Sequence, residues 1–256
     1  MILKRHIPNI VTLLNLFCGS IAVIFAVYNN FAAAAIFVFS GIFFDFFDGL
    51  LARKLNVQSP LGVQLDSLAD MVTSGLVPGI IMFKLLSMAV DTPYFIESSD
   101  VWATNMEWTG FKISWLPLIG LLIPLSSAYR LAKFNIDEEQ QNYFKGLPTP
   151  ANTLLIISLP LIMEYQNNDL MNEIILNKWF LIVVTLISCY LLNSNIKLFA
   201  LKFKNFGFKD NAVRYVFLIL TVVFLVLLQF AAIPIIILLY VILSLISSSL
   251  VSNSNL

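Results

Sequence analysis

The chain has 256 residues, of which 59% are hydrophobic and only 12% charged, with a mean hydropathy of +0.87 and no net charge at neutral pH. Soluble domains carry about 25% charged residues, so this composition excludes a soluble protein and predicts a polytopic membrane protein. The balanced charge indicates no nucleic-acid partner, and the two cysteines lie in apolar runs, where no disulfide framework is expected.

Apolar runs separated by short polar segments predict an all-α, polytopic helix bundle with about eight transmembrane helices. In chain order, the expected helices cover residues 9–28, 31–54, 60–88, 113–134, 150–165, 179–193, 212–230 and 233–251. We expect a single membrane domain over residues 1–256. Its core, about residues 8–195, carries the polar motifs, and the helices over about 212–251 are additions at the C-terminal end.

The distribution of charge predicts how these helices are oriented. With the N-terminus inside, most of the 15 Lys and Arg residues fall in inner segments. The predicted outer loops carry acidic residues instead, namely Asp91, Glu97, Asp100, Glu107, Glu164, Asp169 and Glu173. The sequence therefore predicts an inner cell membrane protein with both termini in the cytoplasm and a polar cleft that opens to the cytoplasm.

Four carboxylates interrupt the second and third predicted helices. Asp45 and Asp48 are three residues apart, and Gly62, Asp66 and Asp70 follow one another at a spacing of four. Each set shares one helix face, and a short turn separates the two helices. Two antiparallel helices would thus direct two carboxylates each into one cleft. Ionisable groups at membrane depth are costly and indicate a functional site.

Carboxylates in such a cluster need a compensating charge. Mg²⁺ and Mn²⁺ take oxygen ligands, and four carboxylates suit two such ions and a phosphoryl-transfer reaction. From the residues alone, other interpretations stay open. One is a buried ion-pair network with Arg53, and another is a proton relay or cation pathway in a transporter.

The segment from Asp45 to Asp70 reads Asp-x2-Asp-Gly-x2-Ala-Arg-x8-Gly-x3-Asp-x3-Asp. It resembles, without a gap, the signature of the CDP-alcohol phosphotransferases, integral membrane enzymes that join a CDP-linked lipid or alcohol to an acceptor hydroxyl and release CMP. The resemblance implies metal ligation by all four aspartates and a further role for Asp70 as general base. The positions it implies for binding the CDP-linked lipid are Asn9, Thr12, Gly49, Ala52, Arg53 and Gly62.

Further stretches resemble the phosphatidylserine synthases of bacteria and archaea, namely residues 8–19, 66–70, 127–135 and 144–150. This resemblance implies CDP-diacylglycerol as donor, L-serine as acceptor, a setting of membrane lipid, and a homodimer. Two positions depart from the pattern, because Lys133 and Ser74 stand where Arg and an aromatic residue are usual. Glycerol 3-phosphate and inositol phosphate remain alternative acceptors within the same chemistry.

Three cations are candidates to bind the carboxylate of the acceptor. Arg130 and Lys133 lie at the predicted inner end of the helix over 113–134, and Lys145 lies in the next inner loop. Their alternative role is ordinary placement of basic side chains at the inner membrane surface, where long cationic side chains reach toward water.

Overall fold

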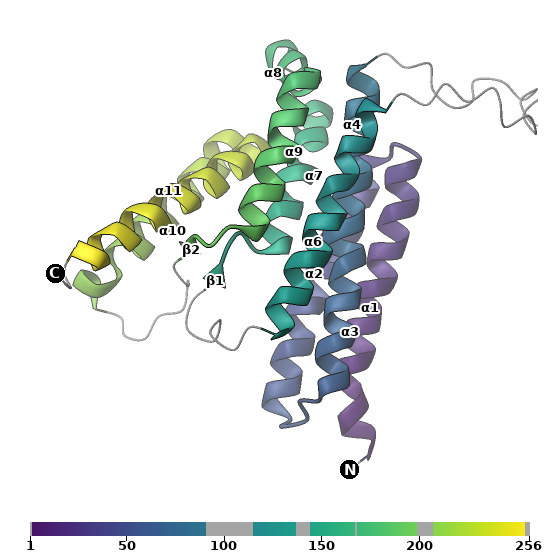
Figure 1. Ribbon diagram of the computed structural model, residues 1–256, viewed down its shortest axis with the longest axis vertical. Helices are drawn as coiled ribbons and strands as arrows, with labels where there is room; N and C mark the ends of the chain where they lie inside the picture. The colour runs from purple at the N-terminus through teal and green to yellow at the C-terminus, as the bar shows by residue number, and fades with distance from the viewer. Residues whose placement is uncertain (1, 91–114, 137–143, 167, 199–206, 254–256) are drawn as a thin grey trace, which may run out of the picture.

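The computed structural model describes residues 2–90, 115–136, 144–166, 168–198 and 207–253 (Figure 1). Over these residues the chain is helical, apart from one pair of two-residue strands, so the predicted all-α class is confirmed there. The α-helices are α1 (Ile2–Val27), α2 (Phe31–Lys54), α3 (Pro60–Asp70), α4 (Val77–Ala89), α6 (Leu122–Ile136), α7 (Thr149–Tyr165), α8 (Asp169–Ile175), α9 (Lys178–Asn193), α10 (Phe208–Leu228) and α11 (Ala232–Asn253).

Helices α1 and α2 form an antiparallel hairpin along one side of the bundle (Figure 1). Small side chains fill one buried cluster between them: Ala22, Ala26, Ala34, Ala35 and Val38. Small residues allow helix backbones to approach closely inside a membrane. The hairpin in turn packs against α3 and α4, which places the polar residues of α1 close to those of α2 and α3.

Helix α4 runs through the middle of the bundle, where it contacts α1, α6, α7 and α9. Its largest side chains are fully shielded from solvent: Ile81, Met82, Leu85 and Leu86. They share a hydrophobic cluster with Ile156 and Ile157 of α7 and with Leu181 of α9. This packing gives the helices that carry the carboxylates a rigid support.

The turn between α2 and α3 has the features that its sequence predicts. Ser59 caps α3, because its hydroxyl oxygen accepts a hydrogen bond from the Gly62 amide at 3.1 Å, and Pro60 occupies the first helical position. Asn56 adopts a positive φ of 53°, a conformation that asparagine tolerates better than most residues. The two carboxylate-bearing helices are thus joined by a short, locally stabilised turn.

The helix predicted over residues 60–88 is one continuous stretch from Pro60 to Ala89, but it is not uniform. Residues Met71–Leu76 are π-helical, a conformation that is rare and frequent at functional sites. Thr73, Ser74 and Gly75 within it are buried. The carbonyl of Ser74 accepts a hydrogen bond from the Thr153 hydroxyl of α7 at 2.9 Å. The predicted helix is therefore confirmed in extent, and it contains a π-helical segment that the sequence did not predict.

Four stretches of the described residues are long and apolar enough to cross a membrane: His6–Val27, Phe31–Lys54, Pro60–Ala89 and Val213–Ile246. Helices α8 and α9, bent by 61°, add a fifth if they are taken as one span. The helix predicted over 113–134 begins, within the described part of the chain, as a 3-10 turn (Leu116–Leu121) and continues as α6. Several spans are thus supported, and the number eight stays a prediction.

Helices α10 and α11 form a hairpin that leans away from the bundle (Figure 1). Their bounds are close to those of the two helices predicted over 212–230 and 233–251. Beside it, β1 (Phe144–Lys145) pairs antiparallel with β2 (Lys197–Leu198). The hairpin is attached through a second hydrophobic cluster, in which Ile237 and Val241 of α11 join Leu147, Leu191 and Leu198. The Gln166 side chain at the end of α7 also bonds to the backbone of Leu228 and Ala231.

Candidate metal site

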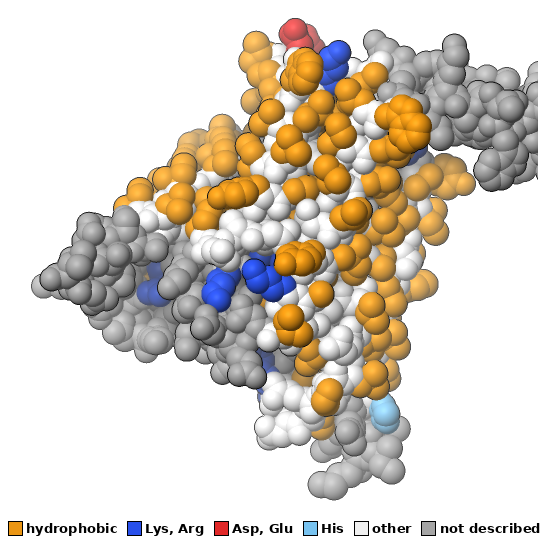
Figure 2. Space-filling view, in the orientation of Figure 1, with side chains coloured by type: hydrophobic (Ala, Val, Ile, Leu, Met, Phe, Trp, Pro, Cys, Tyr) orange, Lys and Arg blue, Asp and Glu red, His pale blue; other side chains and the backbone are white. Residues whose placement is uncertain are grey.

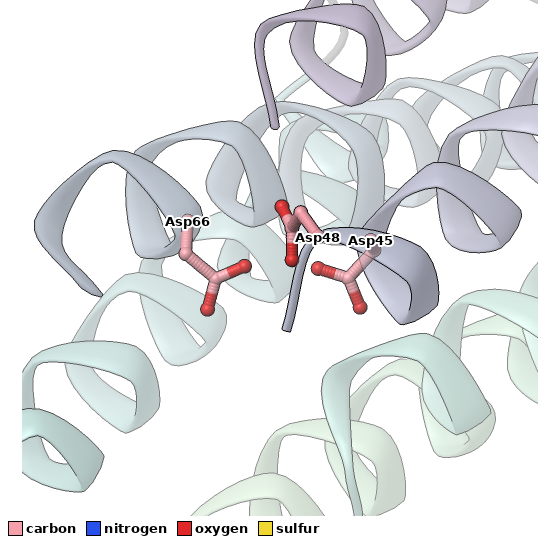
Figure 3. Close-up of side chains that lie close together, drawn as sticks. All are labelled: Asp45, Asp48 and Asp66. Carbon is pink, nitrogen blue, oxygen red and sulfur yellow. The ribbon is translucent and has the colours of Figure 1, made fainter. Parts of the chain in front are cut away.

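Three of the four predicted ligands meet between α2 and α3. Asp45 and Asp48 come from α2 and Asp66 from α3, and one carboxylate oxygen of each lies within 4.8 Å of those of the other two. Figure 3 shows the three side chains directed toward one another from the two helices. Asp48 is buried and the other two are half-buried. We call Asp45, Asp48 and Asp66 the aspartate triad.

The composition of the aspartate triad fits a divalent cation. All three donors are carboxylate oxygens, which Mg²⁺ and Mn²⁺ prefer over nitrogen or sulfur ligands. Three carboxylates gathered within 4.8 Å, one of them buried and two half-buried, repel one another strongly unless a positive charge joins them. The residues present are therefore suited to the metal that the sequence predicted.

Asp70 lies beside the triad but outside it. It ends α3 one helical turn beyond Asp66, immediately before the π-helical segment. Its Oδ1 accepts a hydrogen bond of 3.3 Å from the side-chain amide of Asn15 in α1. Asp70 thus adjoins the candidate metal site and also has a contact that no triad member shares among the described hydrogen bonds.

Helix α1 lines the other side of the site with residues that are predicted to bind the CDP-linked lipid. The Thr12 hydroxyl donates to Asp48 Oδ2 and is also 3.1 Å from the carbonyl of Pro8. Asn9 lies against α3, because a Cβ atom placed on Gly62 would be only 3.3 Å from Asn9 Oδ1. The structure thus brings Asn9, Thr12 and Gly62 together next to the triad.

The remaining predicted CDP-lipid residues follow Asp48 along α2. Arg53 is exposed, and its Nε donates to the carbonyl of Gly49 at 3.0 Å. A Cβ atom on Gly49 would meet only Arg53 Nη2, at an ordinary 3.8 Å, so this glycine is not required by close helix packing. Ala52 is half-buried. The small residues and the exposed guanidinium lie toward the end of α2, away from the apolar core.

Two residues of the site were not singled out from the sequence. Asn15 and Thr73 are both fully buried, and the Thr73 hydroxyl donates to Asn15 Oδ1 at 2.8 Å. A signal was available, since Asn15 is an amide in an apolar helix three residues after Thr12. Thr73 is likewise three residues after Asp70, and this spacing places residues on one helix face.

The three predicted acceptor ligands also lie together, in a surface pocket at the ends of α6 and α9. Arg130, Lys133 and Lys145 line this pocket with Phe134, Leu192, Asn193 and Ser194. Figure 2 shows Lys and Arg side chains gathered on the surface between the bundle and the C-terminal hairpin. We call this hollow the basic pocket.

The guanidinium of Arg130 is occupied by backbone carbonyls. The residue is only 8% exposed, and its Nη1 donates to the carbonyls of Lys145 at 2.9 Å and Leu192 at 2.6 Å. Its Nη2 donates to the carbonyl of Gly146 at 3.3 Å. Arg130 therefore joins α6 to β1 and to the end of α9, whereas Lys133 and Lys145 are half-buried.

Comparison with known proteins adds a family and named relatives. Residues 5–191 match the model of the CDP-alcohol phosphatidyltransferase family. The CDP-diacylglycerol–serine O-phosphatidyltransferase of Bacillus subtilis is 35% identical over 159 residues, which are 60% of this chain and 75% of that protein. The enzyme of the same name from Saccharomyces cerevisiae is 27% identical over 175 residues, covering 62% and 55% of the two chains.

An archaetidylserine synthase of Methanothermobacter thermautotrophicus is 28% identical over 163 residues, 62% of this chain and 60% of that protein. The chain thus spans little more than half the length of two of these three relatives. The family match includes the aspartate triad, Asp70 and Asn15, and it ends before α10.

Proposed function

The chain belongs to the CDP-alcohol phosphatidyltransferase family, and we propose that within it this protein transfers the phosphatidyl group of CDP-diacylglycerol to the hydroxyl of L-serine, forming phosphatidylserine and CMP. The choice of acceptor rests on the similar proteins from bacteria and yeast, which are serine O-phosphatidyltransferases. The aspartate triad supports the chemistry, since it suits a divalent cation.

We assign Asp45, Asp48 and Asp66 to the metal and extend this to two ions, with Asp70 near the second. When bound, Mg²⁺ or Mn²⁺ would neutralise negative charge on the phosphate that is transferred. The donor lipid would lie against α1 and α2, where Asn9, Thr12, Gly49, Ala52, Arg53 and Gly62 are available to hold its cytidine and pyrophosphate.

Asp70 is the group proposed to activate the acceptor. A serine hydroxyl is a poor nucleophile unless a base takes its proton. In the proposed step, the serine oxygen forms a bond to the phosphorus of the phosphatidyl group, and the bond from that phosphorus to the CMP oxygen breaks. The proton moves to Asp70 and the electron pair leaves with CMP. The place of Asp70 one helical turn beyond Asp66 of the triad supports this role.

The basic pocket is proposed to bind the serine carboxylate. Lys133 and Lys145 would supply the direct charge, and Arg130 would hold the backbone that carries Lys145. A lysine at position 133 can pair with a carboxylate but lacks the two-pronged geometry of arginine. A serine amide without the carboxylate should therefore be a much poorer acceptor.

We further propose eight membrane spans, with the Leu116–Leu121 turn and α6 forming the fourth and α7 the fifth. Both termini and the site would lie on the cytoplasmic side of an inner cell membrane, where CDP-linked lipids and divalent cations are accessible. Homodimer formation is proposed on family resemblance, and crosslinking in native membranes that yields monomer alone would contradict it.

The test is an acceptor panel with purified protein in liposomes that contain CDP-diacylglycerol and Mg²⁺ or Mn²⁺. We expect CMP and labelled phosphatidylserine to form in equal amounts, and a chelator to abolish both. Glycerol 3-phosphate and inositol phosphate serve as competing acceptors, and Asp66→Asn as the inactive control. CMP release that is indifferent to serine, or faster with another acceptor, would refute the serine assignment.

A further inference from the structure

A chain of two hydrogen bonds connects the π-helical segment to Asp70 through helix α1. The Thr73 hydroxyl donates to the side-chain oxygen of Asn15 at 2.8 Å, and the Asn15 amide nitrogen donates to Asp70 Oδ1 at 3.3 Å. An ionised carboxylate only accepts hydrogen bonds, and an amide accepts through its oxygen and donates through its nitrogen. The Thr73 hydroxyl also lies 3.2 Å from the backbone carbonyl of Asn15, and its shorter bond to Oδ1 favours the orientation in which the amide nitrogen faces Asp70.

The surroundings leave little room for these side chains to move. Asn15 and Thr73 are both 0% exposed. A Cβ atom on Gly41 of α2 would lie 2.7 Å from Thr73 Cγ2 and 2.9 Å from Asn15 Oδ1, and one on Gly19 of α1 would overlap with Thr73 Oγ1. Two glycines therefore provide the space in which the pair is packed.

The π-helical segment is held from its other side as well. The carbonyl of Ser74, next to Thr73, accepts a hydrogen bond from Thr153 of α7 at 2.9 Å. Asp70 ends α3 and Thr73 lies within the π-helical segment that follows, and both bond to the same asparagine. The backbone and the side chains therefore agree in directing Asp70 toward α1.

We propose that Asn15 and Thr73 are positioning residues for the transfer reaction, in which Thr73 orients the Asn15 amide and Asn15 holds the carboxylate of Asp70 toward the acceptor hydroxyl. This inference rests on the proposed role of Asp70 as the base. With Oδ1 bonded to Asn15, the second oxygen is the one that takes the proton. A base must lie within hydrogen-bond reach of the proton it abstracts, and small displacements of reacting groups cost rate steeply.

The test compares Thr73→Ser with Thr73→Ala. Both variants lose the methyl group that faces Gly41, so they differ only in the hydroxyl. We expect kcat of Thr73→Ala to be lower than that of Thr73→Ser by roughly 10-fold or more, by analogy with residues that orient the ligands of a metal. The affinity for CDP-diacylglycerol and the KM for serine should be alike in the two variants.

A second comparison tests whether the hydroxyl acts through Asn15. In an Asn15→Ala background, Thr73→Ser and Thr73→Ala should have the same kcat, because the group that transmits the effect is gone. Equal kcat values in the native background, or an undiminished difference in the Asn15→Ala background, would overturn the inference. So would a matching loss of CDP-diacylglycerol binding in Thr73→Ala. The first comparison decides alone if Asn15→Ala does not fold.

The rate of CMP release by the wild-type protein in the same preparation distinguishes a failure of this inference from a failure of the proposed function. If serine supports no CMP release but another acceptor in the panel does, serine is refuted and the Thr73 comparison is made with that acceptor. If no acceptor supports CMP release, both the proposed function and the positioning role are refuted. Thermal unfolding in detergent establishes that the compared variants are folded.

Discussion

The four aspartates occupy two different kinds of position. Asp45, Asp48 and Asp66 direct carboxylate oxygens at one another, whereas Asp70 ends α3 and bonds to Asn15. Thr12 bonds Asp48 from α1, so a triad member and Asp70 are each held by a different polar residue of the same helix. This separation gives the carboxylates distinct expected responses to mutation.

Asp66→Asn should weaken metal-dependent binding of CDP-diacylglycerol, because it removes one charge from the triad. Asp70→Asn should leave that binding largely intact while kcat falls about 10²–10⁴-fold, the usual loss when a general base is removed. Binding of CDP-diacylglycerol and turnover are measured side by side for each variant. If Asp70→Asn loses binding as severely as Asp66→Asn, Asp70 acts as a fourth metal ligand and not as the base.

At the scale of elements, the site depends on how closely α1, α2 and the π-helical segment approach one another. Gly41 is buried where these three elements meet, and side chains added there have no open space to enter. Gly49, two turns further along α2, faces no such contact. Close helix packing therefore requires a glycine at position 41 but not at position 49.

Gly41→Ala should destabilise the protein by about 1–3 kcal/mol, the usual cost of overpacking a well-packed interior, and should lower kcat by displacing Thr73 or Asn15. Gly49→Ala is the matched control for stability and should leave the midpoint of thermal unfolding nearly unchanged. Both midpoints are measured in the same detergent. An unfolding midpoint for Gly41→Ala equal to that of Gly49→Ala would contradict the tight packing described at Gly41.

The elements differ in how well the sequence predicts them. The helices over 31–54 and 150–165, and the capped start of α3 at Ser59, were predicted closely because Pro, Ser and Asn mark their ends. The π-helical segment was not, since Met71–Leu76 has the same apolar character as a regular helix. Its conformation depends on contacts with α1 and α7, which are distant in the chain.

The same distinction applies to the site. The spacing of Asp45, Asp48 and Asp66 on two adjacent helices predicted that they would meet, and they do. The bond from Asn15 to Asp70 joins residues 55 positions apart, and no local pattern encodes such a pairing. Arg130 was predicted as a basic residue near the acceptor, but its three bonds to backbone carbonyls depend on where α9 ends.

At the scale of the whole molecule, the turn between α2 and α3 and the short helix α8 lie at opposite ends of the bundle (Figure 1). Gln58 is exposed in the former and Glu173 in the latter. The carboxylates are carried by the two helices that meet at the α2–α3 turn. The proposed orientation places this end on the cytoplasmic side and α8 on the outside.

Single cysteines test this orientation once Cys18 and Cys189 are replaced by alanine. Gln58→Cys should react with a membrane-impermeant maleimide in inside-out vesicles and not in intact cells. Glu173→Cys should react in intact cells. Detergent-solubilised samples, in which both positions should react, control for local accessibility. The reverse labelling pattern would show that the candidate metal site faces the outer side.

The position of the bonding partners along the chain also has a consequence for biosynthesis. All three residues of the aspartate triad are present once residue 66 has been made. The guanidinium of Arg130 can bond to the carbonyl of Leu192, and β1 can pair with β2, only after those later residues have been made. Because chains emerge N-terminus first and fold as they do so, the nascent protein holds clustered negative charge long before its basic pocket can close. The triad is thus available to bind a divalent cation before the residues that complete the basic pocket have been made.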